Sequence, residues 1–503
     1  MRRIVAALAC VCALVVAAAG VAGAAPDAGA GGPASPLPKA QTVATHHTAR
    51  IGRRTIAYTA TAGTIILTDA KDEPAASVFY VAYTANGMGP SALRPITFAY
   101  NGGPGAASAL IHMGAFGPRM VVTANGAVTP PPPYDVVDNP NSLLDTSDLV
   151  FIDPVGTGFS RVTGRGSAKD FYGVEQDGRA FAQFIRRYIT ASDRWNSPKF
   201  LAGESYGTAR SAVLANMLQN EGISLSGVVL MSTVLDYDTI ATQPGNDLPY
   251  WLFLPSETAI AAYHHKLARP PADLPALLQT VRAFAEGPYL GALAKGANLA
   301  PAERDAVAQQ LHADTGLPLD YVLRSRLRVD PDRFEKQLLN ATDETIGRFD
   351  ARFRGFDVDP VADRAETDPS ADAVFGAFTA AFNAYVRNEL HYQTDARYEF
   401  LSSDVFRQWQ WHRGDNGSIA GVNVLGELRN VLTANPYLRV FSANGIYDLA
   451  TPFFATEYSL AHLGLAPELQ GHITFGYYPA GHMIYLNPVA HAALKADLVQ
   501  FYR

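Results

Sequence analysis

The sequence contains very little cysteine, no excess of basic charge and only one long hydrophobic run. Both of its cysteines, Cys10 and Cys12, lie within the first 24 of the 503 residues. Without that segment the chain has no thiol for a disulfide, a cysteine nucleophile or a thiolate metal site. The formal net charge is −7 and no run of lysine or arginine occurs, which argues against a nucleic-acid partner. The composition, 48% hydrophobic and 17% charged, is that of a globular protein with a sizeable core.

The long hydrophobic run lies at the N-terminus. Arg2 and Arg3 precede an apolar stretch from Ile4 to about Val21, and residues 22–24 (Ala-Gly-Ala) have the form of a cleavage site. This order is typical of a secretory signal peptide over residues 1–24. Because the run is short and rich in alanine, we favour a signal over a transmembrane anchor. We therefore predict a secreted or periplasmic protein with no stable membrane association after signal cleavage.

The rest of the chain divides by composition and periodicity. Residues 25–45 are rich in Ala, Gly and Pro and are predicted to be a disordered leader. Strand patterns alternate with helical patterns over 46–237, which favours an α/β fold with a mostly parallel central sheet flanked by helices. Helical patterns dominate 238–430, which we interpret as a largely helical cap insertion over the carboxyl edge of the sheet. Residues 431–503 restore the strand pattern and complete the core.

The strongest motif lies at residues 203–207, Gly-Glu-Ser-Tyr-Gly, a match to G-x-S-x-G. A short apolar strand pattern at 200–202 precedes it, and a helix-compatible run at 208–219 follows. This strand–turn–helix order is that of a nucleophile elbow, which exposes a serine at the top of an α/β-hydrolase sheet. The sequence therefore predicts an α/β-hydrolase fold with Ser205 as the nucleophile.

A serine hydroxyl needs a base to take its proton and an acid to orient that base. In α/β-hydrolases the acid and then the histidine follow the serine along the chain. Asp448 follows a strand pattern at 437–442, and His482 follows another at 473–478. Both positions fall at the carboxyl edge, where open α/β sheets bind ligands. We predict Ser205, Asp448 and His482 to be the catalytic residues.

Acyl transfer also needs hydrogen-bond donors for the oxyanion. One is expected to be the backbone N–H of Tyr206, directly after the nucleophile. The second is expected from the glycine-rich loop at 101–105, which follows a strand pattern at 96–100. The histidine pairs at 46–47 and 264–265 have no third ligand at suitable spacing, so we predict no metal and no cofactor.

These stretches resemble the serine carboxypeptidases, the family that includes cathepsin A and the yeast and plant enzymes. The similar segments are residues 101–108, 152–160, 203–207, the loop around Asp448 and residues 480–483, and they occur in the family's order. The segment 112–118 is similar to the bacterial secreted branch. The resemblance implies an exopeptidase whose substrates are peptide or protein C-termini.

The resemblance also implies roles for individual residues. Gly103 and Tyr206 would supply the oxyanion donors. Asn101, Gly102 and Glu204 would bind the C-terminal carboxylate of the substrate. Because two carboxyl groups can meet only when one is protonated, Glu204 implies a preference for acid pH.

Three features depart from the family's pattern. Ala106 and Ala107 stand where the family usually has cysteine, and Gly114 and Ala115 occupy the region of a second glutamate. The segment 444–448 reads Asn-Gly-Ile-Tyr-Asp where Gly-Asp-x-Asp is common. An esterase or acyltransferase acting on small acyl substrates therefore remains the alternative. A catalytically silent binding protein of the same fold is a third reading, against which the intact serine, aspartate and histidine argue.

Overall fold

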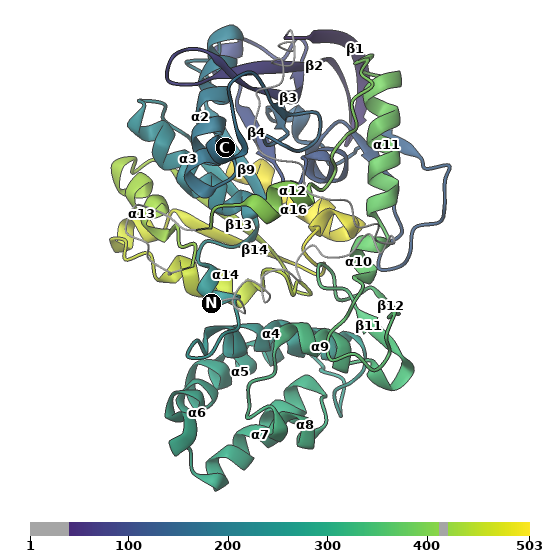
Figure 1. The fold of residues 1–503 in the computed structure, drawn as a ribbon, viewed down its shortest axis with the longest axis vertical. Coiled ribbons are helices and arrows are strands. Elements are labelled where there is room, and N and C mark those ends of the chain that lie inside the picture. Colours follow the sequence, from purple (N-terminus) through teal and green to yellow (C-terminus); the bar gives the residue numbers. More distant parts are fainter. Residues whose placement is uncertain (1–39, 412–420) are drawn as a thin grey trace, which may run out of the picture.

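The computed structural model describes residues 40–411 and 421–503 (Figure 1). The predicted signal peptide and residues 25–39 of the predicted leader lie outside these ranges. A ten-stranded sheet forms the centre of the described chain. Its order is β1 (Thr42–Ile51), β2 (Arg54–Thr68), β3 (Pro74–Ala85), β7 (Asp148–Ile152), β4 (Ile96–Tyr100), β9 (Lys199–Ser205), β10 (Gly227–Thr233), β13 (Arg439–Gly445) and β14 (Ile473–Tyr478), with β8 (Arg161–Val162) paired to β3.

The pairing changes character across the sheet. Strands β1, β2, β3 and β7 pair antiparallel, whereas β7, β4, β9, β10, β13 and β14 follow one another in parallel. The prediction of a mostly parallel α/β sheet is therefore confirmed. Parallel pairing brings the carboxyl ends of β4, β9, β10, β13 and β14 to one edge, where the loops that carry the predicted site begin.

The end of the predicted leader needs a correction. Residues Thr42–Thr45 belong to β1 and pair with residues 60–63 of β2. Their small and polar side chains indicated disorder, but strand formation depends strongly on context. Here the backbone hydrogen bonds of the neighbouring strand supply that context.

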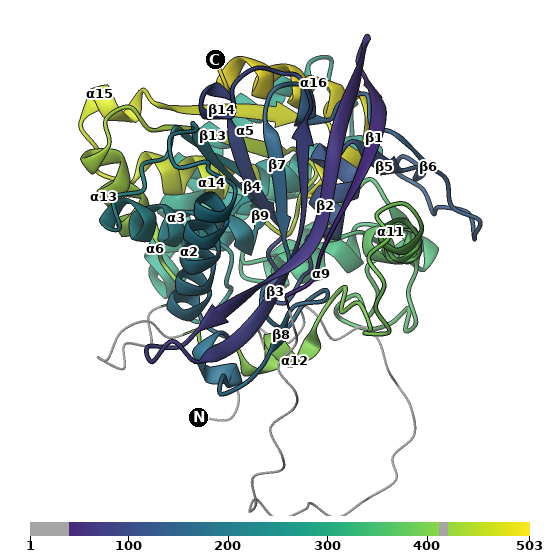
Figure 2. The ribbon, with the colours of Figure 1, turned by 90° about the horizontal axis from the view of Figure 1, so that it is seen from above.

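Helices cover both faces of the sheet (Figures 1 and 2). One apolar core joins the sheet to α2 (Val174–Ala191), α3 (Tyr206–Asn220) and α13 (Leu425–Ala434). A second core, on the other face, joins it to α11 (Phe375–Asn388) and α16 (Pro488–Phe501). In α2 the helical spacing of Phe181, Phe184 and Ile185 places all three side chains in the first core.

A mainly helical lobe lies at the carboxyl edge of the sheet and is drawn at the bottom of Figure 1. It leaves the sheet after β10 and has its own apolar core. Its elements are α4 (Leu248–Tyr263), α5 (Leu274–Phe284), α6 (Leu290–Lys295), α7 (Pro301–Thr315), α8 (Leu319–Arg324), α9 (Pro331–Gln337) and the hairpin of β11 (Glu344–Ile346) and β12 (Arg354–Phe356). Helix α14 (Phe453–Ala461) joins the lobe to the sheet, since Phe454 contacts Trp251 of α4 edge to face.

The chain then returns from the lobe to the main body through α10 (Pro369–Asp372), α11 and α12 (Ser403–Gln408). The remaining elements are the small hairpin of β5 (Arg119–Val121) and β6 (Val136–Asp138), and the short helix α15 (Pro467–Gln470). The boundaries of the domains stay predictions. No helix within the described ranges is long and apolar enough to cross a membrane.

Candidate active site

Ser205 lies at a sharp junction between β9 and α3. Its backbone has φ 62° and ψ −131°, a conformation that costs a non-glycine residue of order 1–3 kcal/mol. Glycine is required at position 203, where a Cβ would overlap the carbonyl oxygen of Gly207. A Cβ on Gly207 would make a tight contact, 3.1 Å, with the carbonyl oxygen of Tyr100. The strained turn has the geometry of a nucleophile elbow.

The glycine-rich loop at 101–105 follows β4 and lies directly against the start of α3. A Cβ on Gly102 would lie 2.5 Å from the backbone nitrogens of Tyr206 and Gly207, so only glycine permits this approach. Gly103 has φ +100°, which also favours glycine. The two backbone segments predicted to supply the oxyanion donors are thus neighbours in space.

Asp448 and His482 are brought together by the loops after β13 and β14. Nδ1 of His482 lies 2.8 Å from Oδ2 of Asp448, and both side chains are buried. The other carboxylate oxygen accepts the backbone N–H groups of Ala450 (2.7 Å) and Thr451 (2.9 Å). The hydroxyl of Thr451 donates to Oδ2 at 2.7 Å. These bonds fix the aspartate so that it orients the imidazole with Nδ1 protonated and Nε2 free to act as a base.

Charges around His482 set its basicity. Burial lowers its pKa, but the Asp448 carboxylate and Glu204 raise it, and the net pKa lies above the usual 6.5. The guanidinium of Arg348, on the lobe segment between β11 and β12, opposes this rise. The next residue, Phe349, accepts the backbone N–H of His482 at 2.5 Å and places its ring 5.2 Å from the imidazole. The lobe therefore contacts the histidine directly.

Glu204 is a buried carboxyl group next to the predicted nucleophile. The side-chain amide of Asn101 donates to its Oε1 at 2.7 Å, and the hydroxyl of Tyr485 donates to the same oxygen at 3.3 Å. Burial raises the pKa of Glu204 to about 7, although the nearby His482 acts in the opposite direction. Near neutral pH this carboxyl group is therefore partly protonated and can donate a hydrogen bond.

A buried ion pair lies beneath the site. The Arg210 side chain of α3 is completely buried, and its Nε donates to Oδ2 of Asp177 in α2 at 2.7 Å. Its Nη1 donates to the backbone carbonyl of Asn101 at 2.7 Å, and its guanidinium lies 4.5 Å from the ring centre of Phe181. The pair therefore connects both helices to the glycine-rich loop.

Backbone hydrogen bonds hold the glycine-rich loop near Ala106 and Ala107, the positions where the resemblance leads one to expect cysteine. The N–H of Ala107 donates to the carbonyl of Phe400 at 3.0 Å, and the N–H of Ser402 donates to the carbonyl of Gly105 at 2.8 Å. These bonds join the loop to the segment before α12. A short antiparallel contact between Ala106 and Leu401 lies between them.

The structure brings three pairs of the predicted site residues into contact. Asp448 contacts His482, Asn101 contacts Glu204, and Gly102 lies against Tyr206. Sequence reasoning missed the contacts that Thr451, Phe349 and Tyr485 make with these residues. Tyr485 lies only three positions after His482, so its proximity to the predicted base was a usable signal. The catalytic roles themselves stay predictions.

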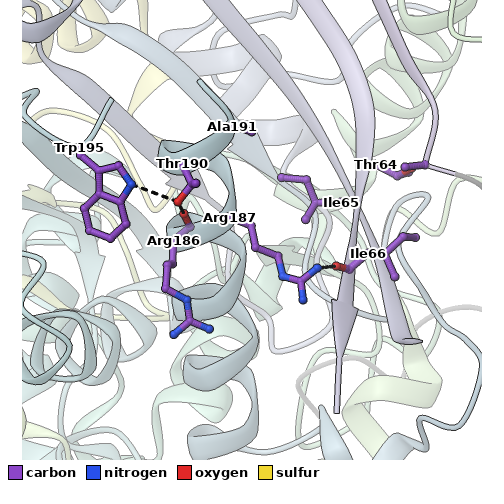
Figure 3. Close-up of a pocket in the computed structure, with 9 residues that line it drawn as sticks. Thr64, Ile65, Ile66, Arg186, Arg187, Thr190, Ala191 and Trp195 are labelled. Carbon is purple, nitrogen blue, oxygen red and sulfur yellow. Dashed lines mark hydrogen bonds between the residues drawn. The ribbon is translucent and has the colours of Figure 1, made fainter. Parts of the chain in front are cut away.

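A surface hollow of about 590 Å³ lies elsewhere, between β2 and α2 (Figure 3). Its lining residues are Ala40, Thr64, Ile65, Ile66, Arg186, Arg187, Thr190, Ala191 and Trp195. None of the predicted site residues contributes to it. Among the residues that the structure describes, no cluster of three or more His, Cys, Asp or Glu side chains could hold a metal ion.

A protein-family model matches the part of the chain that contains the glycine-rich loop and Ser205. Residues 58–251 match the model of the family described as serine carboxypeptidase. Over these residues the chain is similar to the serine carboxypeptidase family. The matched segment contains the glycine-rich loop and Ser205 and ends before Asp448 and His482. Among curated proteins, none matches the chain in sequence.

Some solved structures also match the chain. Kex1(Δ)p, a prohormone-processing carboxypeptidase from Saccharomyces cerevisiae, matches with a TM-score of 0.57 and 16% identity over 88% of this chain and 91% of that chain. A proline iminopeptidase from Mycobacterium smegmatis matches with a TM-score of 0.36 and 15% identity over 91% and 97% of the two chains. The predicted α/β-hydrolase fold is confirmed, and the family match and the fold together support a serine carboxypeptidase enzyme.

Proposed function

We propose that the protein is a secreted serine-type carboxypeptidase that hydrolyses C-terminal peptide bonds through Ser205, His482 and Asp448. The observation that carries this proposal is the position of Glu204. This carboxyl group is buried, bound to Asn101, directly precedes Ser205 and interacts electrostatically with His482. A serine hydrolase that acts on neutral acyl groups has no need of a protonatable acid there.

The chemistry follows from the roles of the three residues. Nε2 of His482 takes the proton of the Ser205 hydroxyl as its oxygen attacks the carbonyl carbon of the last peptide bond. The N–H groups of Gly103 and Tyr206 stabilise the oxyanion that forms. The imidazolium then gives its proton to the leaving amine, the C–N bond breaks and an acyl-enzyme remains. Water, deprotonated by the same imidazole, hydrolyses this ester and restores the serine.

Recognition of the substrate's end depends on a neutral Glu204. When protonated, it donates a hydrogen bond to the C-terminal carboxylate, beside the amide of Asn101 and the backbone N–H of Gly102. When ionised, it repels that carboxylate. The proposed selectivity for a free C-terminus therefore falls as the pH rises through the Glu204 pKa of about 7.

Secretion rests on the sequence, since residues 1–24 lie outside the described ranges. The substrates would then be peptides or proteins with accessible C-termini outside the cytoplasm. No nucleic-acid partner is expected from a chain of net charge −7.

Mass spectrometry of two matched substrates tests the proposal. An N-blocked dipeptide and its C-terminal amide would be incubated with the purified protein in mildly acidic and in neutral buffer. We expect loss of the C-terminal residue from the free acid, with much slower cleavage of the amide. Hydrolysis of a simple ester with cleavage of neither peptide would instead favour the esterase or acyltransferase alternative.

A further inference from the structure

Tyr485 lies in the short helical turn Ile484–Leu486, three residues after His482, and its side chain is buried. We propose that Tyr485 is a positioning residue for Glu204 and takes the place of the second glutamate that the resemblance leads one to expect. This inference rests on the proposed carboxypeptidase function. It names Tyr485 as the hydrogen-bond partner that Glu204 needs in order to recognise the substrate carboxylate.

The first argument is the distribution of donors around Glu204. The Tyr485 hydroxyl and the Asn101 amide both donate to Oε1, at 3.3 and 2.7 Å. A further hydrogen bond connects the Tyr485 hydroxyl with the Asn101 side chain. The other oxygen, Oε2, is buried and has no hydrogen-bond partner in the described part of the chain. Two donors on Oε1 favour a proton on Oε2, because the carbonyl-type oxygen is the better acceptor. Oε2 is then the atom left to donate to a substrate carboxylate.

The second argument is the space opposite Gly114. A Cβ on Gly114 would overlap the ring of Tyr485, with Cε2 and Cδ2 the nearest atoms. Any side chain at position 114 is therefore incompatible with the observed position of the ring. Because this is the region where the resemblance places the second glutamate, Gly114 and Tyr485 form a matched pair that replaces it.

The replacement changes how the site titrates. Burial raises the pKa of the Tyr485 phenol well above 10, so this partner stays neutral over the working range. The ionisable groups that act on Glu204 are then His482, Tyr485 and Asp448. A pair of carboxyl groups would share a proton and titrate as a unit. Here a single carboxyl group, Glu204, controls the recognition of the C-terminus.

Substitution of Tyr485 by phenylalanine tests this assignment, because the ring stays and only the hydroxyl is removed. The readout is the ratio of kcat/KM for an N-blocked dipeptide to kcat/KM for its C-terminal amide, measured across pH. The ratio cancels effects on His482 that both substrates share. The hydroxyl's hydrogen bond lowers the pKa of Glu204. The kcat/KM ratio of free acid to amide falls as Glu204 ionises. We therefore expect this fall to occur at higher pH in Tyr485→Phe than in the wild type. In both proteins its slope should correspond to the loss of one proton.

Two further variants make the result specific. Gly114→Ala should displace the Tyr485 ring, so the fall of the kcat/KM ratio should again move to higher pH. In a Glu204→Gln background, Tyr485→Phe should cause no shift, because no carboxyl group remains to titrate. An unchanged fall in Tyr485→Phe, or a two-proton slope in the wild type, would overturn the inference. Failure of the proposed function looks different: the wild type would then show no preference for the free acid at any pH.

Discussion

Replacing Glu204 with glutamine gives the sharpest test of the proposed recognition of a free C-terminus. Glutamine has nearly the same shape and keeps an oxygen for the amide of Asn101, but it cannot ionise. In the wild type, burial raises the pKa of the Glu204 carboxyl to about 7. The group is thus mostly neutral in mildly acidic buffer and mostly charged in mildly alkaline buffer. Only the neutral form can donate to a substrate carboxylate.

The size of the effect follows from this titration. With a pKa of about 7, the neutral fraction of Glu204 falls roughly tenfold between about pH 5 and about pH 8. The kcat/KM ratio of free acid to amide should fall by about the same factor in the wild type. In Glu204→Gln the ratio should be nearly constant over this range, because glutamine does not titrate.

The assay follows the release of the C-terminal residue or its amide by mass spectrometry at several pH values. The amide is the matched control, since it lacks the charge that an ionised Glu204 would repel. A ratio that still falls tenfold in Glu204→Gln would refute the reasoning and assign the titration to another group. A ratio that stays constant with pH in the wild type would refute the proposed role of the Glu204 carboxyl group.

Three other substitutions test separate parts of the site. Ser205→Ala should abolish covalent labelling by a fluorophosphonate; persistent labelling would mean that another residue is the nucleophile. Arg348→Gln removes a positive charge that lowers the pKa of His482, so the acid limb of kcat/KM for a neutral ester should move to higher pH; a shift to lower pH would contradict this. Asp177→Ala leaves the buried Arg210 without its counter-charge and should cost about 3–5 kcal/mol in chemical denaturation, whereas a loss under 1 kcal/mol would show that the ion pair is not needed.

The parts of the site that the sequence predicts are those encoded locally. The elbow around Ser205 needs only a strand, a helix and two glycines within a few residues, and all of them occur in the printed sequence. Asp448 and His482 are predicted because each follows a strand pattern, and parallel strands end at one edge of the sheet. The glycine-rich loop is predicted in the same way, because it follows the strand pattern at 96–100.

Two of the missed contacts, those of Tyr485 with Glu204 and of Phe349 with His482, join segments that are distant along the chain. Tyr485 and Glu204 are 281 positions apart, and none of the recognised motifs contains the tyrosine. Phe349 reaches His482 from the lobe, whose helical patterns predicted its secondary structure but not its orientation. The start of β1 was misjudged for a related reason, because Thr42–Thr45 form a strand only through pairing with β2.

The two proton requirements of the site oppose each other, and this has a consequence for its pH dependence. In the proposed function, catalysis needs a neutral His482, whose pKa is raised above 6.5, whereas recognition of a free C-terminus needs a protonated Glu204, whose pKa is about 7. The two groups are coupled: ionised Glu204 raises the pKa of His482, and His482 lowers that of Glu204. Protonation of Glu204 therefore removes one cause of the raised pKa of His482 and favours the free base. The active combination is thus most populated between the pKa values of the two groups, whereas the resemblance alone implied an acid preference. Peptide amides and esters, which need only the neutral His482, should keep their activity at higher pH.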